Sequence, residues 1–363
     1  MSATSPPLDP AIDLPQAMER ARAAREQGAW AEAERFYHAV LKLAPSHAEA
    51  WSELAAVLQA RGAPDKAQAA RKKAAEVAIA AAATTAASLL DTALEERAPA
   101  ILRKALQNHP SLPAGHLALG ELLRRMGDLG GALLAVQRCL ELEPGNSRAS
   151  KLVVALKGGS FPSDETTAVP APVWVIDDFL PAALHQEVLQ QALAHRAALQ
   201  PSTTVQTTRE NWRRSQVDRY PAFGERVLES ICRMAETAIG RFALEPFDIV
   251  SRDMQFTAHN EGDYYKVHRD RQPGDMGHRR LTYVYYLHRQ PRGFDGGGLR
   301  LFDTTRDGSS YFDQAWSKVL PRDNRLVLFP SHVWHEVEEV RCRSGLYEDS
   351  RFTLNGWLGV TPE

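Results

Sequence analysis

The sequence predicts a chain of two dissimilar domains, an α-helical solenoid followed by an antiparallel β-sandwich or barrel with flanking helices. Three observations support this fold class. A 34-residue period recurs in an Ala- and Leu-rich first part, and many short apolar segments separated by Gly, Pro and Asp turns fill the second part. A Gly- and Pro-punctuated stretch lies between the two parts. The length of 363 residues also fits two domains.

Composition and charge limit the possible partners. The hydrophobic fraction of 44% is ordinary for a folded soluble protein, and the net charge of -2 disfavours bulk electrostatic attraction to nucleic acid or to a membrane. The three cysteines are scattered, so no disulfide framework is expected and a reducing compartment fits. Neither a signal-peptide pattern nor an apolar run of about 20 residues is visible, so we expect a cytoplasmic protein.

The first part begins with a flexible tail, residues 1–13, and continues as a helical repeat domain over residues 14–155. Gly28 recurs as Gly62, 34 residues later, and Pro110 recurs as Pro144 at the same spacing. This is the tetratricopeptide period, and the pattern resembles an array of about four such units. A generic helical bundle is the alternative interpretation. Such arrays offer concave grooves, so a protein or peptide partner is expected here.

One repeat unit departs from the period. Pro45 and Pro110 are 65 residues apart, three fewer than two full periods. The unit around residues 79–112 also has Ala93 where the other units place their interhelix glycine. We therefore expect an irregular unit in the middle of the array.

Residues 156–172 read as a linker, and residues 173–363 as the second domain. Residues 173–176 form a short apolar run, and helices are expected over 180–197 and 223–242. The expected strands are 248–258, 264–270, 280–288, 298–303, 317–320, 325–329, 334–340 and 351–359. The triplet at 296–298 lacks the Gly-Lys-Ser/Thr of a phosphate-binding loop and is expected to form a turn or bulge.

Two segments of the second domain carry a candidate metal site. His268 and Asp270 are two residues apart, so on an extended strand their side chains point to the same face. Two histidines and one carboxylate form the facial ligand set of non-haem Fe(II) oxygenases. His335, which follows an apolar run at 326–329, is the candidate third ligand; His332 is its rival, and spacing alone does not choose between them.

A candidate anion anchor follows 16 residues after His335. Arg351 and Thr353 share one strand face, and a buried Arg fork suits a carboxylate. Arg341 and Arg343 are competitors, but they lie in a polar segment that reads as an inserted loop.

These segments resemble a known family, the Fe(II)- and 2-oxoglutarate-dependent dioxygenases, and within it the prolyl 4-hydroxylase branch. Five blocks match in order, at residues 261–270, 281–287, 296–302, 335–337 and 350–353. The resemblance covers about residues 173–360, roughly half of the chain. It implies a double-stranded β-helix, or jelly roll, for the second domain.

The resemblance also implies the cofactors. Fe(II) is expected to be held by His268, Asp270 and His335. The co-substrate 2-oxoglutarate is expected to pair with Arg351, assisted by Thr353 and Tyr286. Thr282 shares the strand face of Tyr286, opposite to that of Tyr283 and Tyr285, and is expected to contact the co-substrate as well. O2 is the second substrate, and L-ascorbate is the usual reductant of the family. A basic cluster around Trp212 (Arg209, Arg213, Arg214 and Arg219) is interpreted as a lid near the pocket mouth.

The sequence thus predicts a dioxygenase that hydroxylates an unactivated C–H bond. The resemblance and the repeats together favour a prolyl, or other, residue of a protein or peptide docked by the repeat domain. The alternatives are a small-molecule hydroxylase whose repeats bind a partner, and a catalytically silent repeat scaffold. Nucleic-acid demethylation is disfavoured because Trp357 stands where those relatives carry a second arginine.

Overall fold

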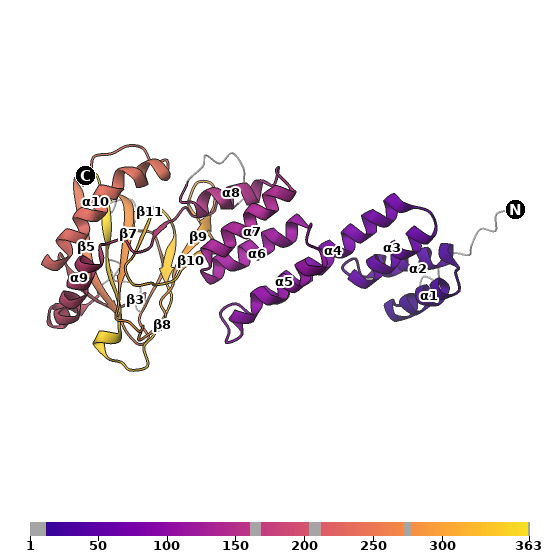
Figure 1. Cartoon of the computed structure of the whole chain (residues 1–363), viewed down its shortest axis with the longest axis horizontal. Helices are drawn as coiled ribbons and strands as arrows, with labels where there is room; N and C mark the ends of the chain where they lie inside the picture. The colour runs from indigo at the N-terminus through magenta and orange to yellow at the C-terminus, as the bar shows by residue number, and fades with distance from the viewer. Residues whose placement is uncertain (1–11, 160–167, 203–211, 272–276, 362–363) are drawn as a thin grey trace. The chain divides into compact units, whose positions relative to one another are not determined.

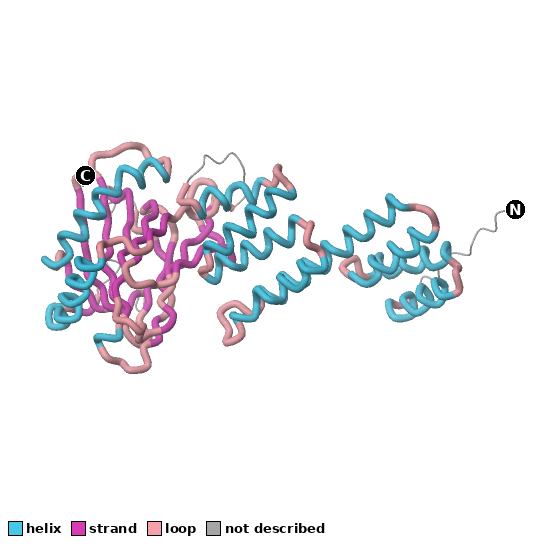
Figure 2. The backbone as a smooth tube through the Cα atoms, viewed as in Figure 1, coloured by secondary structure: helices cyan, strands magenta, loops and turns pink. Residues whose placement is uncertain are grey.

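The computed structural model describes residues 12–159, 168–202, 212–271 and 277–361 (Figure 1). It divides into two compact units. The N-terminal unit comprises residues Met1–Leu122 and Arg138–Pro144, and the C-terminal unit comprises Leu123–Gln137 and Gly145–Glu363. Figure 2 shows that the strands all belong to the C-terminal unit.

The first half of the described chain is helical. Its helices are α1 (Leu14–Glu26), α2 (Trp30–Leu43), α3 (Ala48–Ala60), α4 (Pro64–Ala87), α5 (Ala98–Asn108), α6 (Pro113–Met126), α7 (Leu129–Leu142) and α8 (Ser147–Leu156). Asp13 caps α1 by accepting a hydrogen bond from the Gln16 amide at 2.9 Å. Gly28 and Gly62 both have positive φ in the turns that follow α1 and α3, where glycine is the residue best suited to this conformation.

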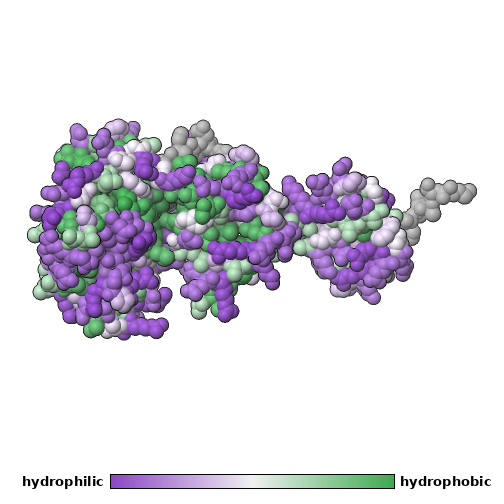
Figure 3. All heavy atoms as spheres, in the orientation of Figure 1, coloured by the Kyte–Doolittle hydropathy of each residue, from purple (hydrophilic) through white to green (hydrophobic). Residues whose placement is uncertain are grey.

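Small residues allow these helices to pack closely. Ala33 and Ala67 are fully buried, and Tyr37 and Leu54 fill the space between the helices. Hydrophilic residues predominate on the face of α1 to α3 that is visible in Figure 3. The helical character of this part is therefore observed, whereas its assignment as a tetratricopeptide solenoid stays a prediction.

The irregular unit has a structural explanation. Helix α4 runs without a break through residues where the 34-residue register expects one helix to end and the next to begin. After Pro64 its sequence contains neither Gly nor Pro and is rich in Ala, so nothing in it terminates the helix. Ala93 lies in the turn between α4 and α5, as its place in the register predicted.

The C-terminal unit contains two large antiparallel sheets. The seven-stranded sheet has the order β1-β11-β7-β14-β5-β4-β2, the five-stranded sheet β10-β9-β12-β6-β3, and β8 pairs with β13. The strands of the larger sheet are β1 (Trp174–Ile176), β2 (Gln200–Pro201), β4 (Gln216–Arg219), β5 (Ser251–His259), β7 (Arg279–Leu287), β11 (Arg325–Pro330) and β14 (Arg351–Gly359). The others are β3 (Arg213–Arg214), β6 (Tyr264–His268), β8 (Asp295–Gly296), β9 (Leu299–Thr304), β10 (Tyr311–Val319), β12 (His335–Val337) and β13 (Val340–Arg341).

Helices α9 (Ala182–Ala194) and α10 (Glu225–Arg241) pack on one face of the larger sheet (Figure 1). Tyr283 and Tyr285 of β7 join this helix-covered core, whereas Tyr286 joins the core on the opposite face. Alternate residues of β7 therefore face opposite sides, as the sequence predicted. Two antiparallel sheets with flanking helices are consistent with the jelly roll of the 2-oxoglutarate oxygenases.

The boundary between the two compact units does not coincide with the linker predicted at residues 156–172. Parts of α6 and α7, and all of α8, belong to the C-terminal unit. The reason is a buried charge cluster in which Asp303 of β9 accepts hydrogen bonds from Arg124 of α6, at 2.8 Å to each carboxylate oxygen, and from Arg148 of α8, at 2.7 Å. Residues 160–167 of the predicted linker lie outside the described residues.

Most predicted strands and helices agree with the observed ones to within a few residues. The exceptions are that β10 begins earlier than expected, that the predicted strand 334–340 is divided between β12 and β13, and that β2, β3, β4 and β8 were not predicted. Gly296, the last residue of β8, and Gly297 have positive φ just before β9. Among the described residues, no helix combines the length and apolar character needed to cross a bilayer.

Candidate metal centre

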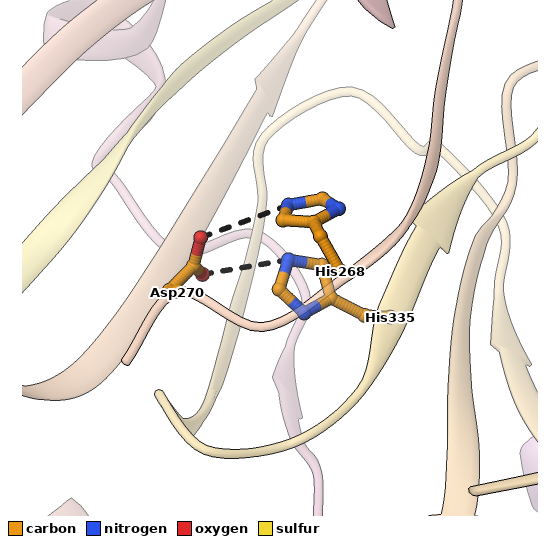
Figure 4. A group of neighbouring side chains, drawn as sticks. All are labelled: His268, Asp270 and His335. Carbon is orange, nitrogen blue, oxygen red and sulfur yellow. Dashed lines mark ion pairs between the residues drawn. The ribbon is translucent and has the colours of Figure 1, made fainter. Parts of the chain in front are cut away.

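Three buried side chains converge between the two sheets (Figure 4). His268 is the last residue of β6, His335 is the first residue of β12, and the two lie directly opposite each other in antiparallel register. His268 Nε2 is 3.7 Å from Asp270 Oδ1, and His335 Nε2 is 3.4 Å from Asp270 Oδ2. One potential ligand atom from each residue lies within 4.8 Å of the other two.

The structure brings together the predicted triad but corrects one step of the argument. Strand β6 ends at His268, so Asp270 lies beyond the strand and not on it. Its carboxylate is positioned instead by Thr282, whose hydroxyl donates to Asp270 Oδ2 at 2.8 Å. Thr282 had been predicted to contact the co-substrate, and its observed partner is the candidate metal ligand.

Hydrogen bonds also orient both imidazoles. Nδ1 of His268 lies 2.8 Å from the Lys266 carbonyl oxygen, and Nδ1 of His335 lies 2.9 Å from the Val333 carbonyl oxygen. A carbonyl oxygen can only accept, so each Nδ1 carries the proton and each Nε2 lone pair is directed toward Asp270.

The electrostatics favour a neutral imidazole at His268 and an ionised carboxylate at Asp270. Burial, reinforced by His335, lowers the pKa of His268 to about 3. Burial opposes ionisation of Asp270, but His335 and His268 outweigh it and the pKa of this carboxyl is lowered. These are the protonation states in which an imidazole and a carboxyl group bind a metal ion.

Arg351, at the start of β14, is 1% exposed and lies beside the triad. Its Nε donates to the Gly297 carbonyl oxygen at 2.8 Å and its Nη2 to the Tyr286 hydroxyl at 3.4 Å, while Nη1 is 3.3 Å from His259 Nδ1. No described carboxylate forms an ion pair with it. A buried cation without a counter-charge is unfavourable, so this position suits the carboxylate of a ligand.

Residues of β14 continue the pocket wall at every second position. Thr353, Asn355 and Trp357 line the pocket together with Arg351, as expected for one strand face. The hydroxyls of Thr353 and Thr257 both donate to Asn355 Oδ1, at 3.1 and 2.8 Å. The predicted pair of Arg351 and Thr353 therefore lies on one wall, and Thr353 is held by Asn355.

The rival residues lie elsewhere. His332 is exposed and is not part of the cluster, and Arg341 and Arg343 are also exposed. His259 lies beside Arg351, and burial followed by the charge of Arg351 lowers its pKa well below the usual value, so it is neutral. Its Nε2 has no hydrogen-bond partner among the described residues.

Several pocket residues had no clear signal in the sequence. Gln255, Tyr265 and Arg279 line the pocket from β5, β6 and β7, and each looks there like an ordinary strand residue. Of the predicted lid, Arg213 and Arg219 line the pocket from β3 and β4, Arg214 pairs with Asp263, and Arg209 lies outside the described residues.

Comparison with known proteins agrees with this site. Residues 254–359 match the model of the 2OG-Fe(II) oxygenase superfamily. This segment contains the three candidate ligands and Arg351. This part of the chain therefore resembles a 2OG-Fe(II) oxygenase domain, which belongs to a class of oxidoreductases.

More particular relatives lie within that class. An uncharacterized PKHD-type hydroxylase of a Synechocystis species is 32% identical over 199 residues, which cover 53% of this chain and 65% of that protein. The chain thus spans slightly less than two thirds of the length of this curated relative. Among solved structures, a Pseudomonas putida prolyl-4-hydroxylase is 24% identical with a TM-score of 0.39, covering 53% of this chain and 94% of that one. A viral collagen prolyl hydroxylase from Paramecium bursaria Chlorella virus-1 is 16% identical with a TM-score of 0.35, covering 52% and 96%.

Proposed function

We propose that this chain is an Fe(II)- and 2-oxoglutarate-dependent dioxygenase that hydroxylates an unactivated C–H bond. The observation that carries the proposal is a buried set of two imidazoles and one carboxylate beside a buried arginine without a described counter-charge. The first feature suits Fe(II) with open coordination positions, and the second suits the free carboxylate of a dicarboxylic co-substrate.

The residues present fit both groups. His268, Asp270 and His335 would hold Fe(II), and Arg351 would pair with 2-oxoglutarate, with Tyr286 and Thr353 on the walls beside it. When bound, Fe(II) and 2-oxoglutarate supply the oxidising chemistry that activates O2, with ascorbate as the reductant that keeps the metal in its ferrous state. The chain itself orients these groups and buries them away from bulk water.

The Thr282 hydroxyl and two backbone carbonyl groups position the three candidate metal ligands. Thr282 fixes Asp270, and the carbonyls of Lys266 and Val333 fix the ring orientation of the two histidines. Such outer partners hold metal ligands in place before the metal arrives.

We further propose that the substrate is a prolyl, or other, residue of a cytoplasmic protein or peptide that the N-terminal helices dock. The name of the PKHD-type relative and the helical first half of the chain support this proposal. Hydroxylation of a small molecule, with the helices binding a separate partner, is the alternative.

The test uses the full-length protein with Fe(II), 2-oxoglutarate and ascorbate. Slow succinate release without added substrate is expected, and chelation of the metal should stop it. Incubation with lysate proteins followed by mass spectrometry should reveal a gain of one oxygen, expected on proline. Absence of succinate release under both conditions contradicts the oxygenase activity, whereas succinate release without any modified protein contradicts only the protein substrate.

A further inference from the structure

The pocket beside the triad carries an excess of positive charge. Asp270 is the only acidic residue among its described lining residues. Its lining arginines are Arg213, Arg219, Arg269, Arg279 and Arg351. Because Fe(II) and 2-oxoglutarate carry equal and opposite charges, their binding would leave this excess in place.

Two of these arginines already have a role. Arg351 is assigned to the co-substrate. Arg269 donates to the Gly308 carbonyl oxygen at 3.1 Å and its guanidinium carbon lies 4.5 Å from the centre of the Trp334 ring. Arg213, Arg219 and Arg279 are left for the substrate part of the pocket, and of these Arg279 also forms an ion pair with Asp253 at 3.8 Å.

Arg213 packs against an aromatic ring that itself stacks on a candidate metal ligand. Strand β3 pairs with β6, which places Arg213 opposite Tyr265, and its guanidinium carbon lies 4.9 Å from the centre of that ring. Tyr265 in turn stacks on His268 with 3.6 Å between ring centres. One aromatic ring therefore separates the Arg213 guanidinium from a candidate metal ligand. No described carboxylate forms an ion pair with Arg213.

Arg279 lies beside Trp357 and Asp270. Its guanidinium carbon is 3.5 Å from the centre of the Trp357 ring, and its Nη1 is 3.4 Å from the Asp270 carbonyl oxygen. Burial lowers the pKa of both Arg213 and Arg279, and the charge of Arg219 lowers each further. Arg219 thus repels both of the other guanidinium groups, whereas Asp270 attracts both and Asp253 attracts Arg279. An anion placed among the three arginines would relieve the repulsion by Arg219.

We propose that Arg213, Arg219 and Arg279 bind an anionic group of the substrate, a carboxylate or a phosphate, beside the C–H bond that is hydroxylated. The planar guanidinium fork suits such oxyanions, and the rings of Tyr265 and Trp357 hold two of the three forks in place. This inference rests on the proposed oxygenase activity for the identity of the pocket, but it is tested by binding alone.

The first experiment uses the full-length wild-type protein loaded with Fe(II) and 2-oxoglutarate in the absence of O2. Calorimetry compares two matched pairs of probes, N-acetylproline with N-acetylprolinamide and N-acetyl-Glu-Pro-amide with N-acetyl-Gln-Pro-amide. In at least one pair the acid should bind about tenfold more tightly than its neutral partner, since one charge-assisted contact is worth about that factor. Inorganic phosphate should compete with the acid.

The outcomes distinguish a terminal carboxylate from an acidic side chain as the ligand. They also test the anionic subsite separately from the proposed oxygenase activity. Preference within the first pair indicates a terminal carboxylate, and preference within the second indicates an acidic side chain of a peptide. Equal affinities in both pairs, or no binding of either acid or of phosphate, overturn the anionic subsite. Succinate release, measured separately in air, decides on the oxygenase activity whatever the calorimetry gives.

Single substitutions show which arginines produce the preference for the acid over its neutral partner. Arg213→Gln and Arg279→Gln should each reduce the acid-to-amide affinity ratio about tenfold, whereas Arg213→Lys should retain part of the preference because it keeps the charge. Arg233→Gln, which removes an exposed charge on α10, is the matched control and should keep the wild-type ratio. A wild-type ratio in both Arg213→Gln and Arg279→Gln, or an equal loss of acid and amide binding, overturns the assignment.

Discussion

His268 and His335 each direct one ring nitrogen to a backbone carbonyl and the other toward Asp270. This arrangement fixes the tautomer, because only a protonated Nδ1 can donate to a carbonyl oxygen. With a pKa of about 3, His268 is neutral near pH 7, so binding of a metal ion there does not have to displace a proton from it.

Removing any ligand of the triad should abolish turnover. His268→Ala, Asp270→Ala and His335→Ala each leave two donors, which is too few to hold Fe(II) against water. Metal analysis of the purified variants should find the loss of bound iron, and succinate release should stop. His332→Ala removes an exposed imidazole three residues from His335 and should behave as wild type. Normal succinate release from the three ligand variants would exclude this metal centre.

Thr282 should matter through Asp270. Thr282→Val keeps the shape of the side chain but removes the hydroxyl that donates to the carboxylate, so Fe(II) affinity should fall about 10–100-fold. Thr282→Ser keeps the hydroxyl and should restore most of the affinity. A competitive metal titration measures both. An unchanged affinity in Thr282→Val would mean that this hydrogen bond does not orient the ligand.

Arg351 should govern the co-substrate and not the metal. Arg351→Ala removes the charged partner of a desolvated carboxylate, which costs about 2–5 kcal/mol of binding free energy. The concentration of 2-oxoglutarate needed for half-maximal turnover should rise accordingly, while bound iron is retained. Arg341→Ala, on an exposed side chain, is the control. If Arg341→Ala gives the larger effect, the anchor is wrongly assigned.

The sequence alone identified site residues of metal-binding or anion-binding types that lie close to a partner in the chain. His268, Asp270 and Arg351 stand out in this way, and His335 stands out through the order of the matching blocks. Arg213 shows the limit, because only the pairing of β3 with β6 brings it to the pocket. Non-local pairing of this kind leaves no periodic signal in a single sequence.

At the level of elements, the alternation of side chains along a strand was a reliable guide. It placed Thr353 with Arg351 and separated Tyr286 from Tyr285. It failed at the end of β6, where the chain leaves the strand after His268 and a hydrogen bond from Thr282 takes over the positioning of Asp270. The exact end of an element depends on such tertiary contacts, which a local pattern does not contain.

Asp303 joins strand β9 to helices α6 and α8 and should be important for stability. Asp303→Asn leaves Arg124 buried without its bidentate partner, which should lower the free energy of unfolding by about 3–5 kcal/mol. Denaturant unfolding of the full chain measures the loss. Asp307→Asn, on a side chain in the exposed turn after β9, is the control and should change stability much less.

The contribution of Asp303 should also depend on pH. Burial opposes its ionisation, but Arg124 and Arg148 outweigh burial and lower its pKa in the folded state. A lowered pKa stabilises the fold above the unfolded value of about 4, and this stabilisation is lost as the pH falls through the folded-state pKa. The difference in stability between wild type and Asp303→Asn should therefore shrink on acidification. A difference that grows at low pH would contradict this origin.

For the whole molecule, the sequence located the change from helices to strands but not the edge of the compact C-terminal unit. A change in composition marks where one type of secondary structure ends, and the predicted linker at residues 156–172 lies there. The contacts that draw Leu123–Gln137 and α8 into the C-terminal unit join residues far apart in the chain; Arg124 and Asp303 are 179 positions apart. No local signal reports such a pairing.

This boundary decides how the role of the N-terminal helices should be tested. A chain of residues 111–363 keeps α6, α7 and α8, and with them Arg124 and Arg148 opposite Asp303, whereas a cut at residue 170 removes both arginines. The longer fragment should therefore unfold at higher denaturant concentration than the fragment 170–363. It should also retain succinate release in the absence of substrate, because the complete pocket lies within it.

Modification of lysate proteins should fall strongly in the fragment 111–363. If α1 to α5 dock a protein substrate, they raise its local concentration at the pocket, and their removal returns the reaction to a simple bimolecular encounter. The measurement compares the yield of hydroxylated proline in lysate proteins, by mass spectrometry, between the fragment and the full chain at equal succinate release. Equal yields would mean that the first helices do not dock the substrate and instead bind a separate partner or a second copy of the chain.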